Sequence, residues 1–301
     1  MKSKNSDTFK SIVKNKESYF MTAPYFILFI VFTIVPVLMS IFLSFTSYNI
    51  FQAPEFVGLG NYRRLFINDE VFITALKNTL IFACITGPLS YLICFVLAWI
   101  INDFKPLVRA VFTTIFYAPS ISGSVYMIWQ IMFSSDSYGY INSVLMRLGI
   151  IDSPIYWIED PSKVLWVCII IQLWLSLGTS FLAFIAGFQG VDRSLYEAAA
   201  VDGIRNRWQE LWYVTLPVMK PQLLFASVME ITGAMGVGDL TVNIAGFPSV
   251  DYAAHTIANH ITDYGNTRYE MGYASAIATI LFIMMIGGNK LIQKFIRRVG
   301  E

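Results

Sequence analysis

Charged side chains are scarce in this sequence. Only 14% of its 301 residues are Asp, Glu, Lys or Arg, whereas an ordinary soluble domain holds about 25%. Hydrophobic residues make up 56% of the chain and aromatic residues 16%. Such a chain offers little polar surface to water, but it suits lipid, where aromatic side chains gather at the interfaces. The sequence therefore predicts an integral membrane protein.

Clusters of basic or metal-binding residues are also missing. The net charge of +1 argues against nucleic acid as a partner, since that would call for a concentrated basic field. Cys84, Cys94 and Cys168 all fall inside apolar runs, so we expect them to be small buried hydrophobic residues. His255 and His260 lack the spacing of a zinc motif, and we assign them no ligand role.

No phosphate-binding loop of the form GxxxxGK[ST] occurs in the chain, so this chain is not expected to be an ATPase. A nucleophile and a base at catalytic spacing are absent too, and we expect neither an enzyme nor a bound cofactor. Gly233, Gly236 and Gly238 superficially resemble a dinucleotide loop, but they end an apolar stretch with no strand before them. We expect these glycines to break a helix or to allow close packing.

Six segments can cross a membrane as helices, because a span needs about 20 largely apolar residues. Open strands cannot satisfy their backbone polar groups in lipid, so we predict an all-α fold. The predicted spans are Tyr19–Phe45, Thr79–Asn102, Ala110–Ser134, Val164–Gly190, Trp212–Gly238 and Met271–Gly288. Only the fifth contains charges, Lys220 and Glu230. The first run is too long for a secretion signal, and no small-residue cleavage site follows it, so we expect it to be retained.

Lysine and arginine favour the cytoplasmic side of membrane proteins. With a cytoplasmic amino terminus, 15 of the 21 basic residues fall inside and 6 outside, so both termini are predicted to be cytoplasmic. The inner residues are Lys2, Lys4, Lys10, Lys14, Lys16, Lys105, Arg109, Arg193, Arg205, Arg207, Lys220, Lys290, Lys294, Arg297 and Arg298. The outer residues are Arg63, Arg64, Lys77, Arg147, Lys163 and Arg268.

The inner segment between the fourth and fifth spans, residues 191–217, predicts two short helices that meet at a corner. Asp192 or Ser194 can cap the first helix, and Ser194 has capping-box spacing to Glu197. Gly203 can adopt the left-handed conformation that ends a helix. A second short helix is expected from about Arg205 to before Pro217, which suits the first turn of the next span. On this basis alone the segment is either a capped interfacial helix pair or a docking corner for a partner.

The same segment resembles the EAA signature of permease subunits in bacterial ABC importers. The matching residues are Glu197, Ala198, Ala199, Asp202, Gly203, Leu216 and Pro217. The sequence departs from the family in Ile204, where alanine is usual, and in a slightly longer stretch before Leu216. The resemblance implies that this loop is the coupling helix, which docks into a separate ATPase dimer. That ATPase, not this chain, would use ATP and Mg²⁺.

Weaker similarities point to the carbohydrate-uptake branch of this family, exemplified by maltose permeases. They are Gly60-Asn61-Tyr62, Leu76, Asn78, Thr79, Ala118-Pro119, Trp129, Gly139, Asn142 and the run Met271–Ala276. The resemblance implies a six-span permease domain over residues 19–298, behind a cytoplasmic tail of residues 1–18. It also implies a bacterial cytoplasmic membrane, a second and non-identical permease, an extracytoplasmic solute-binding protein, and a sugar or oligosaccharide as solute.

Polar residues within the fourth and fifth spans are candidates for the solute path, because transporter sites form near the bilayer midplane at broken helices. The candidates are Gln172, Trp174, Ser176, Thr179, Glu230, Thr232, Gly233, Gly236 and Asp239. For Gln172, Ser176 and Thr179 the alternative is plain hydrogen bonding between helices. Glu230 can either contact the solute or pair with the partner permease.

The last outer segment, residues 239–266, is a candidate for gating the path or for receiving the binding protein. This chain has Gly246-Phe247-Pro248 where the family often has Gly-Gly-Pro. Two other functions remain open from the sequence. One is an ABC permease for another solute, such as glycerol phosphate or an amino acid. The other is an ion-coupled carrier, which would need several buried carboxylates or internal repeats.

Overall fold

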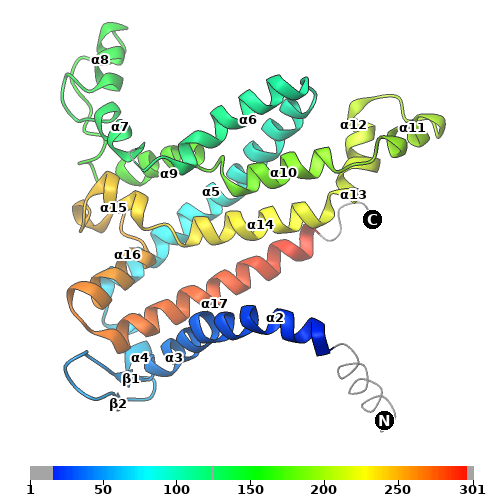
Figure 1. Ribbon diagram of the computed structural model, residues 1–301. Coiled ribbons are helices and arrows are strands. Elements are labelled where there is room, and N and C mark those ends of the chain that lie inside the picture. Colours follow the sequence, from blue (N-terminus) through cyan, green and yellow to red (C-terminus); the bar gives the residue numbers. More distant parts are fainter. Residues whose placement is uncertain (1–15, 124, 297–301) are drawn as a thin grey trace.

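Long α-helices make up the body of the protein (Figure 1), and one small two-stranded sheet is found among the described residues. The structure is a computed structural model that describes residues 16–123 and 125–296. Most of the predicted amino-terminal tail lies outside the described residues. So do the basic residues Lys2, Lys4, Lys10, Lys14, Arg297 and Arg298.

Within the described residues, 4 helical segments are long and apolar enough to cross a membrane, or 6 if each of two bent pairs is one span. The first four are α2 (Lys16–Phe29) with η1 (Ile30–Ile34) and α3 (Val35–Leu43), α5 (Glu70–Asn102), α9 (Val164–Leu175) with α10 (Thr179–Gln189), and α17 (Met271–Ile296). The bent pairs are α6 (Pro106–Ile121) with α7 (Val125–Met132), and α14 (Lys220–Met235) with α15 (Asp239–Ala245). The predicted all-α membrane fold is confirmed, and the count of six stays a prediction.

Four predicted spans differ clearly from the observed helices, and the last of them, α17, runs on to Ile296 beyond the predicted Gly288. Helix α5 begins at Glu70 rather than Thr79, because the Asp69 side chain caps it by accepting a hydrogen bond from the backbone N–H of Phe72. The third predicted span is not one straight helix, since α6 ends at Ile121 and α7 leaves it at 84°. The fifth begins at Lys220 rather than Trp212, with its own proline in the first turn.

Two prolines explain local widening of the helices. The π turns η1 and η2 (Leu211–Thr215) each end two residues before a proline, Pro36 and Pro217. Proline clashes with the carbonyl of the residue four positions earlier and lacks an N–H, so the preceding turn opens to relieve the clash. The distortion at Pro36 is thus spread over one wider turn.

Short elements gather at the two ends of the helix bundle (Figure 1). One end, called the outer end below, holds the hairpin of β1 (Thr46–Ser47) and β2 (Glu55–Phe56), antiparallel with Thr46 opposite Phe56. It also holds α4 (Gly60–Ile67), α8 (Tyr140–Arg147), η3 (Val250–Tyr252), α16 (Ile257–Thr262) and η4 (Asp263–Thr267). The opposite, inner end holds α11 (Arg193–Val201), α12 (Arg207–Glu210), η2 and α13 (Leu216–Val218).

The centre of the bundle is the packing of α5 against α10 and α14. Aromatic rings fill it: the Phe184 centroid lies 5.1 Å from that of Tyr91 and 5.4 Å from that of Phe95. Cys94 and Cys168 are buried in the apolar clusters as predicted, but Cys84 is exposed. The expectation of a buried Cys84 was therefore wrong.

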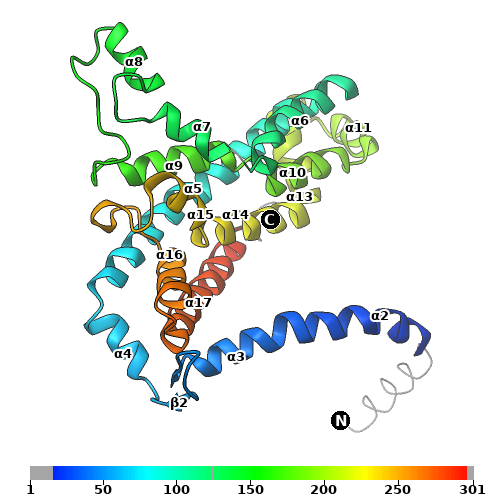
Figure 2. The same cartoon turned by 60° about the vertical axis from the view of Figure 1, so that its left-hand side comes forward.

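The first span stands apart from the rest of the chain (Figure 2). No residue of its most apolar stretch is buried, and the side chain of Phe20 is 83% exposed. Only its outer part is held, where α3 packs against α17 and the N–H of Gly272 donates to the carbonyl of Tyr48 at 2.9 Å. This span therefore presents an uncovered apolar surface to lipid or to another membrane helix.

Candidate functional site

The predicted helix corner is present at the inner end. Helix α11 is capped by Asp192, whose carboxylate accepts from the N–H of Ser194 at 2.9 Å. Glu197 does not form the capping box with Ser194. Its carboxylate lies 3.6 Å from the guanidinium of Arg193, four residues earlier, and its side chain is 72% exposed. Exposure leaves Glu197 open to a partner, because a solvent-exposed pair of this spacing holds it only weakly.

Gly203 ends α11 in the left-handed region as predicted, with φ of 95°. The N–H of Ile204 donates to the carbonyl of Ala199 at 3.0 Å, and the N–H of Gly203 donates to that of Ala200 at 3.3 Å. These two bonds form a Schellman motif, which is commonly completed by an apolar contact from the residue after the glycine. Ile204 supplies that contact by packing on the buried cluster that contains Ala199. The departure from alanine at Ile204 thus strengthens the corner.

The second short helix, α12, begins at Arg207 and is capped by Asn206, which accepts from the N–H of Gln209. The corner is tied to the bundle by a 2.8 Å hydrogen bond between the hydroxyls of Tyr196 and Thr215. Leu216 is buried beneath it. A groove of about 560 Å³ runs along its surface, and its lining includes Ala198, Ala199, Asp202 and Pro217. The structure therefore brings the sequence-predicted coupling residues into one grooved corner.

The fourth span is broken where the candidate path residues lie. Helix α9 ends at Leu175, and α10 begins at Thr179 after the turn at Ser176 and Gly178. A side chain at Gly178 would lie 3.5 Å from the Cβ of Ser120, near the end of α6. The break in the fourth span therefore lies beside the bend between α6 and α7, and such breaks release backbone polar groups inside a membrane.

Ser176 and Glu230 approach the same side chain. The thiol of Cys94 on α5 donates to the carbonyl of Ser176 at 3.3 Å, and its sulfur lies 3.9 Å from the Oε1 of Glu230 on α14. Ser176 is buried and Glu230 is half-buried. These contacts place Glu230 where α5 and α14 meet the break between α9 and α10, within its own chain.

The remaining path candidates are spread over the neighbouring surface. The ring centroid of Trp174 lies 5.3 Å from that of Trp129 on α7, and Gln172 is half-buried. The exposed candidates are Trp174, Thr179, Thr232, Gly233, Gly236 and Asp239. Helix α14 ends at Met235 with Gly236 after it, and α15 continues at 41°. The expected helix break is found at Gly236 and Gly238, whereas Gly233 lies inside α14.

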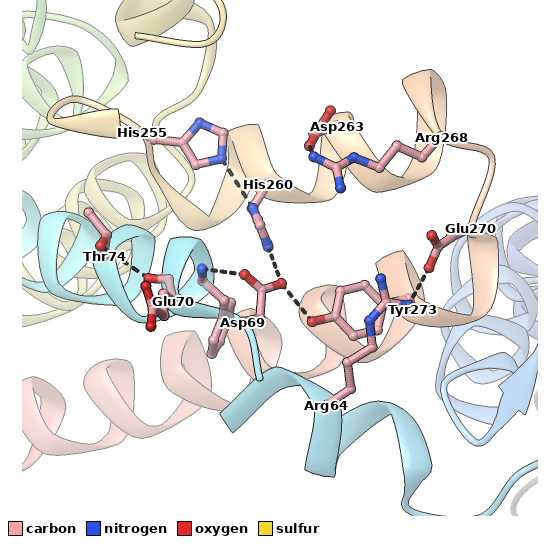
Figure 3. A network of polar contacts seen from close by, with 11 residues as sticks. Arg64, Asp69, Glu70, Thr74, His255, His260, Asp263, Arg268, Glu270 and Tyr273 are labelled. Carbon is pink, nitrogen blue, oxygen red and sulfur yellow. Dashed lines mark hydrogen bonds and ion pairs between the residues drawn. The ribbon is translucent and has the colours of Figure 1, made fainter. Parts of the chain in front are cut away.

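A buried polar network at the outer end was not anticipated from the sequence (Figure 3). The carboxylate of Asp69 accepts from the Tyr273 hydroxyl at 2.7 Å, and its Oδ2 lies 3.0 Å from the Nε2 of His260. The Nδ1 of His260 lies 3.2 Å from the Nε2 of His255. Both histidines are 1% exposed. The network joins the start of α5 to α16 and α17.

Hydrogen bonding decides the charge of this network. Burial by itself raises the pKa of Asp69, but hydrogen bonds from His260, Tyr273 and the backbone of Phe72 outweigh it and hold the pKa well below its usual range. Burial, followed by repulsion from His260, lowers the pKa of His255 to about 4. Asp69 is therefore ionised and His255 neutral at physiological pH. Among the described residues no cluster suited to a metal ion occurs.

Several residues that carry the carbohydrate-branch resemblance hold outer loops together. The amide of Asn78 donates to the carbonyls of Tyr252 and His255, both at 3.0 Å. Asn142 donates to three backbone carbonyls and accepts from the indole N–H of Trp157 at 2.8 Å. These side chains satisfy loop backbone groups that strands or helices would otherwise pair.

Comparison with known proteins identifies the class. Residues 92–300 match the family described as binding-protein-dependent transport system inner membrane component. The chain is 34% identical over 277 residues to the probable ABC transporter permease protein YesP of Bacillus subtilis, covering 90% of this chain and 87% of that protein. It is 32% identical over 274 residues to the lactose transport system permease protein LacF of Rhizobium radiobacter, covering 89% of each.

The fold also matches a solved structure. A chain in the crystal structure of a bacterial alginate ABC transporter, in complex with alginate pentasaccharide-bound periplasmic protein, superposes with a TM-score of 0.77 at 24% identity. The match covers 97% of this chain and 98% of that chain. The protein belongs to the family of binding-protein-dependent transport system inner membrane components. The predicted resemblance to permease subunits of ABC importers is thereby confirmed.

Proposed function

We propose that this protein is one permease subunit of an ATP-driven importer that moves a sugar or oligosaccharide across the bacterial cytoplasmic membrane. The main support for this proposal is the capped, exposed corner around Glu197 and Gly203. It lies at the inner end of the helix bundle, in a chain that belongs to the transport family. The names of relatives such as LacF support a carbohydrate as the solute. The chain itself performs no bond-making chemistry in this proposal.

The inner end faces the cytoplasm. Figure 1 places the α5–α6 turn, α11, the start of α2 and the end of α17 at this same end. Basic residues of the described chain that fall there include Lys105, Arg109, Arg205, Arg207 and Lys294, in keeping with the preference of such residues for the cytoplasmic side. Both termini are therefore cytoplasmic.

A second, non-identical permease covers the uncovered surfaces. The first span buries none of its most apolar stretch within this chain, and helix pairs in membranes join through small residues and close packing. The exposed Thr232, Gly233 and Gly236 of α14 give the kind of small-residue face that another helix can approach.

An ATPase dimer binds the inner corner and supplies ATP hydrolysis with its own Mg²⁺. When ATP closes that dimer, the corner moves with it and biases the bundle from inward-facing to outward-facing. The exposed Glu197 and the groove beside Ala198 and Ala199 offer a contact surface for this docking. An extracytoplasmic solute-binding protein delivers the sugar at the opposite end, where residues 239–266 lie.

The solute passes the breaks in the fourth and fifth spans. Hydroxyls of a sugar need directional partners and its ring faces stack on aromatic side chains. Ser176, Glu230 and the indole of Trp174 provide both kinds of group around the broken helices. A carrier driven by ions is less well supported, since Glu230 is the single acid well inside a span of the described chain.

The test is purification of the chain from gently solubilised membranes, followed by mass spectrometry of the proteins that accompany it. A second permease and an ATPase should be recovered. The complex in lipid vesicles should then hydrolyse ATP faster when its binding protein carries lactose, arabino-oligosaccharide or maltose. If only glycerol phosphate stimulated ATP hydrolysis, the proposed solute would be glycerol phosphate rather than a sugar. A chain that purifies folded without any ATPase would refute the proposal of an importer.

A further inference from the structure

The inner corner makes a second attachment to the bundle, through side chains rather than through the chain itself. The guanidinium of Arg207, the first residue of α12, forms an ion pair with the carboxylate of Asp103 at the end of α5. It also lies 5.2 Å from the ring centroid of Trp99, one turn earlier on α5. The ring of Trp208 lies 4.8 Å from that of Trp99. Two successive residues of the corner therefore contact the last turn of α5.

The inner corner and α5 are not adjacent in the sequence. Helix α10 leads into the corner and α14 leads out of it, so both are covalently joined to α11 and α12, whereas α5 is about 90 residues away. Asp103 is also poorly placed for α5 alone, because a carboxylate at the carboxyl end of a helix opposes the helix dipole. The positive charge of Arg207 compensates for this.

Helix α5 extends from its contact with the inner corner to the outer end of the bundle. Its 33 residues span about 50 Å at 1.5 Å per residue. At its other end, Asn78 holds the carbonyls of Tyr252 and His255, and the hydroxyl of Thr79 accepts from the N–H of Ile257 at 2.9 Å. One continuous helix thus contacts the inner corner and the outer segment together.

We propose that Arg207 and Trp208, acting on Asp103 and Trp99, form a latch that passes displacement of the inner corner to α5. The latch residues are positioning residues, and the inference rests on the proposed function. Exposed ion pairs contribute little to stability alone, and the side chains of Arg207 and Asp103 are 55% and 44% exposed. The latch is therefore a means of coupling motion rather than of holding the fold.

The test uses the full transporter in lipid vesicles with its binding protein and a transported sugar. Sugar uptake, ATP hydrolysis and thermal stability are measured for Arg207→Ala, Asp103→Ala and Trp99→Leu. Uptake per ATP hydrolysed should fall about fivefold or more, the lower range of coupling between distant sites, with little change in melting temperature. The reversed pair, Asp103→Arg with Arg207→Asp, should recover most of the ratio, since an arginine at 103 can pair with 207 and reach the ring of Trp99.

Arg205→Ala is the matched control, because Arg205 is an exposed arginine on the same segment whose guanidinium has no ion pair within the described chain. It should keep the wild-type ratio. Latch variants that keep the ratio while the wild-type complex responds normally to sugar would overturn the latch alone. So would variants that only melt earlier, or a reversed pair no better than the single changes. A wild-type complex without sugar-stimulated ATP hydrolysis would overturn the proposed function and the latch together.

Discussion

The Nε2 of His260 lies 3.0 Å from the Oδ2 of Asp69, although 191 positions separate the two residues in the chain. Both are buried, and the carboxylate also receives the Tyr273 hydroxyl. The contact fastens the cap of α5 to the helices that close the outer segment. A buried network of this kind stabilises its surroundings while every member has a partner, and it is costly when one loses its own.

This network should make the stability of the outer segment depend on pH. The pKa of His255 is lowered to about 4 from its ordinary 6.5, so protonation favours the unfolded chain. The free energy of unfolding is therefore highest above pH 6.5. It decreases by at most about 3 kcal/mol as the pH falls towards 4. Asp69 stays ionised throughout this window, because the pKa of its carboxyl is lowered below its ordinary value of 3.8.

Thermal melting of the detergent-solubilised protein between pH 7 and pH 4 checks this expectation. The wild-type melting temperature should fall across the window. His255→Gln removes the titrating ring and keeps an amide donor for His260, so its melting curve should vary less with pH. Equal slopes for the two proteins would show that other groups control the acid sensitivity.

Gly203 offers a test of the corner geometry. A Cβ added there would meet no atom within 4 Å, so the cost of a valine comes mainly from the positive φ of 95°, about 1–2 kcal/mol for a branched side chain. We expect Gly203→Val to lower sugar uptake per ATP hydrolysed while the protein still reaches the membrane. Gly149→Val is the control, because Gly149 has a φ of 68° and equally open surroundings but follows α8 at the outer end. Coupling lost equally in both variants would mean that general strain is responsible.

The corner and the outer network differ in how far the sequence could predict them. Asp192, Gly203 and the alanines of α11 lie within one local segment, where capping and turn preferences act over a few residues. The cap, the glycine and the corner were therefore predictable. Asp69, His260 and Tyr273 meet only through the tertiary fold, and no local pattern pairs residues so far apart. Asn78 and Met271–Ala276 marked the right places through family resemblance but did not reveal the contacts.

Helix ends in the membrane were predicted less well. The long apolar runs located the helices, because burial in lipid selects composition more than local geometry. The same runs concealed the end of α6 at Ile121 and the turn at Gly178. The short Ser- and Gly-containing segments at both breaks carry no charge, so they did not interrupt the predicted spans. Lys77 hid the first turns of α5 by interrupting its apolar run, while the cap at Asp69 was the missed signal.

Substitution of Glu230 should affect thermal stability and sugar transport differently. An ionised acid inside a span costs on the order of 3 kcal/mol, so Glu230→Gln should leave thermal stability unchanged or raise it. If Glu230 contacts the sugar, losing a charged hydrogen bond of about 1.5 kcal/mol should raise the half-saturating sugar concentration about tenfold. Uptake kinetics of the assembled complex measure this. Cys94→Ser is the control, because it keeps a donor beside Glu230. Loss of the partner permease from purified Glu230→Gln complexes would assign the acid to the subunit interface instead.

Gly272 should be essential for seating the first span on α17. A Cβ at this position would lie 2.1 Å from the carbonyl oxygen of Thr46 and 2.8 Å from the backbone nitrogen of Tyr48. Backbone atoms cannot yield as a flexible side chain does, so Gly272→Ala should force the hairpin away from α17 and destabilise the protein by about 1–3 kcal/mol.

The same helix provides the opposite case for comparison. A Cβ added at Gly287 would meet no atom within 4 Å, and alanine is favoured over glycine inside a helix by about 1 kcal/mol. Gly287→Ala should therefore melt at or above the wild-type temperature in detergent, while Gly272→Ala melts well below it. The two substitutions add the same methyl group to α17, so a similar drop in both would locate the effect in the helix itself. A drop confined to Gly272→Ala would show that close contact with Thr46 holds the first span in place.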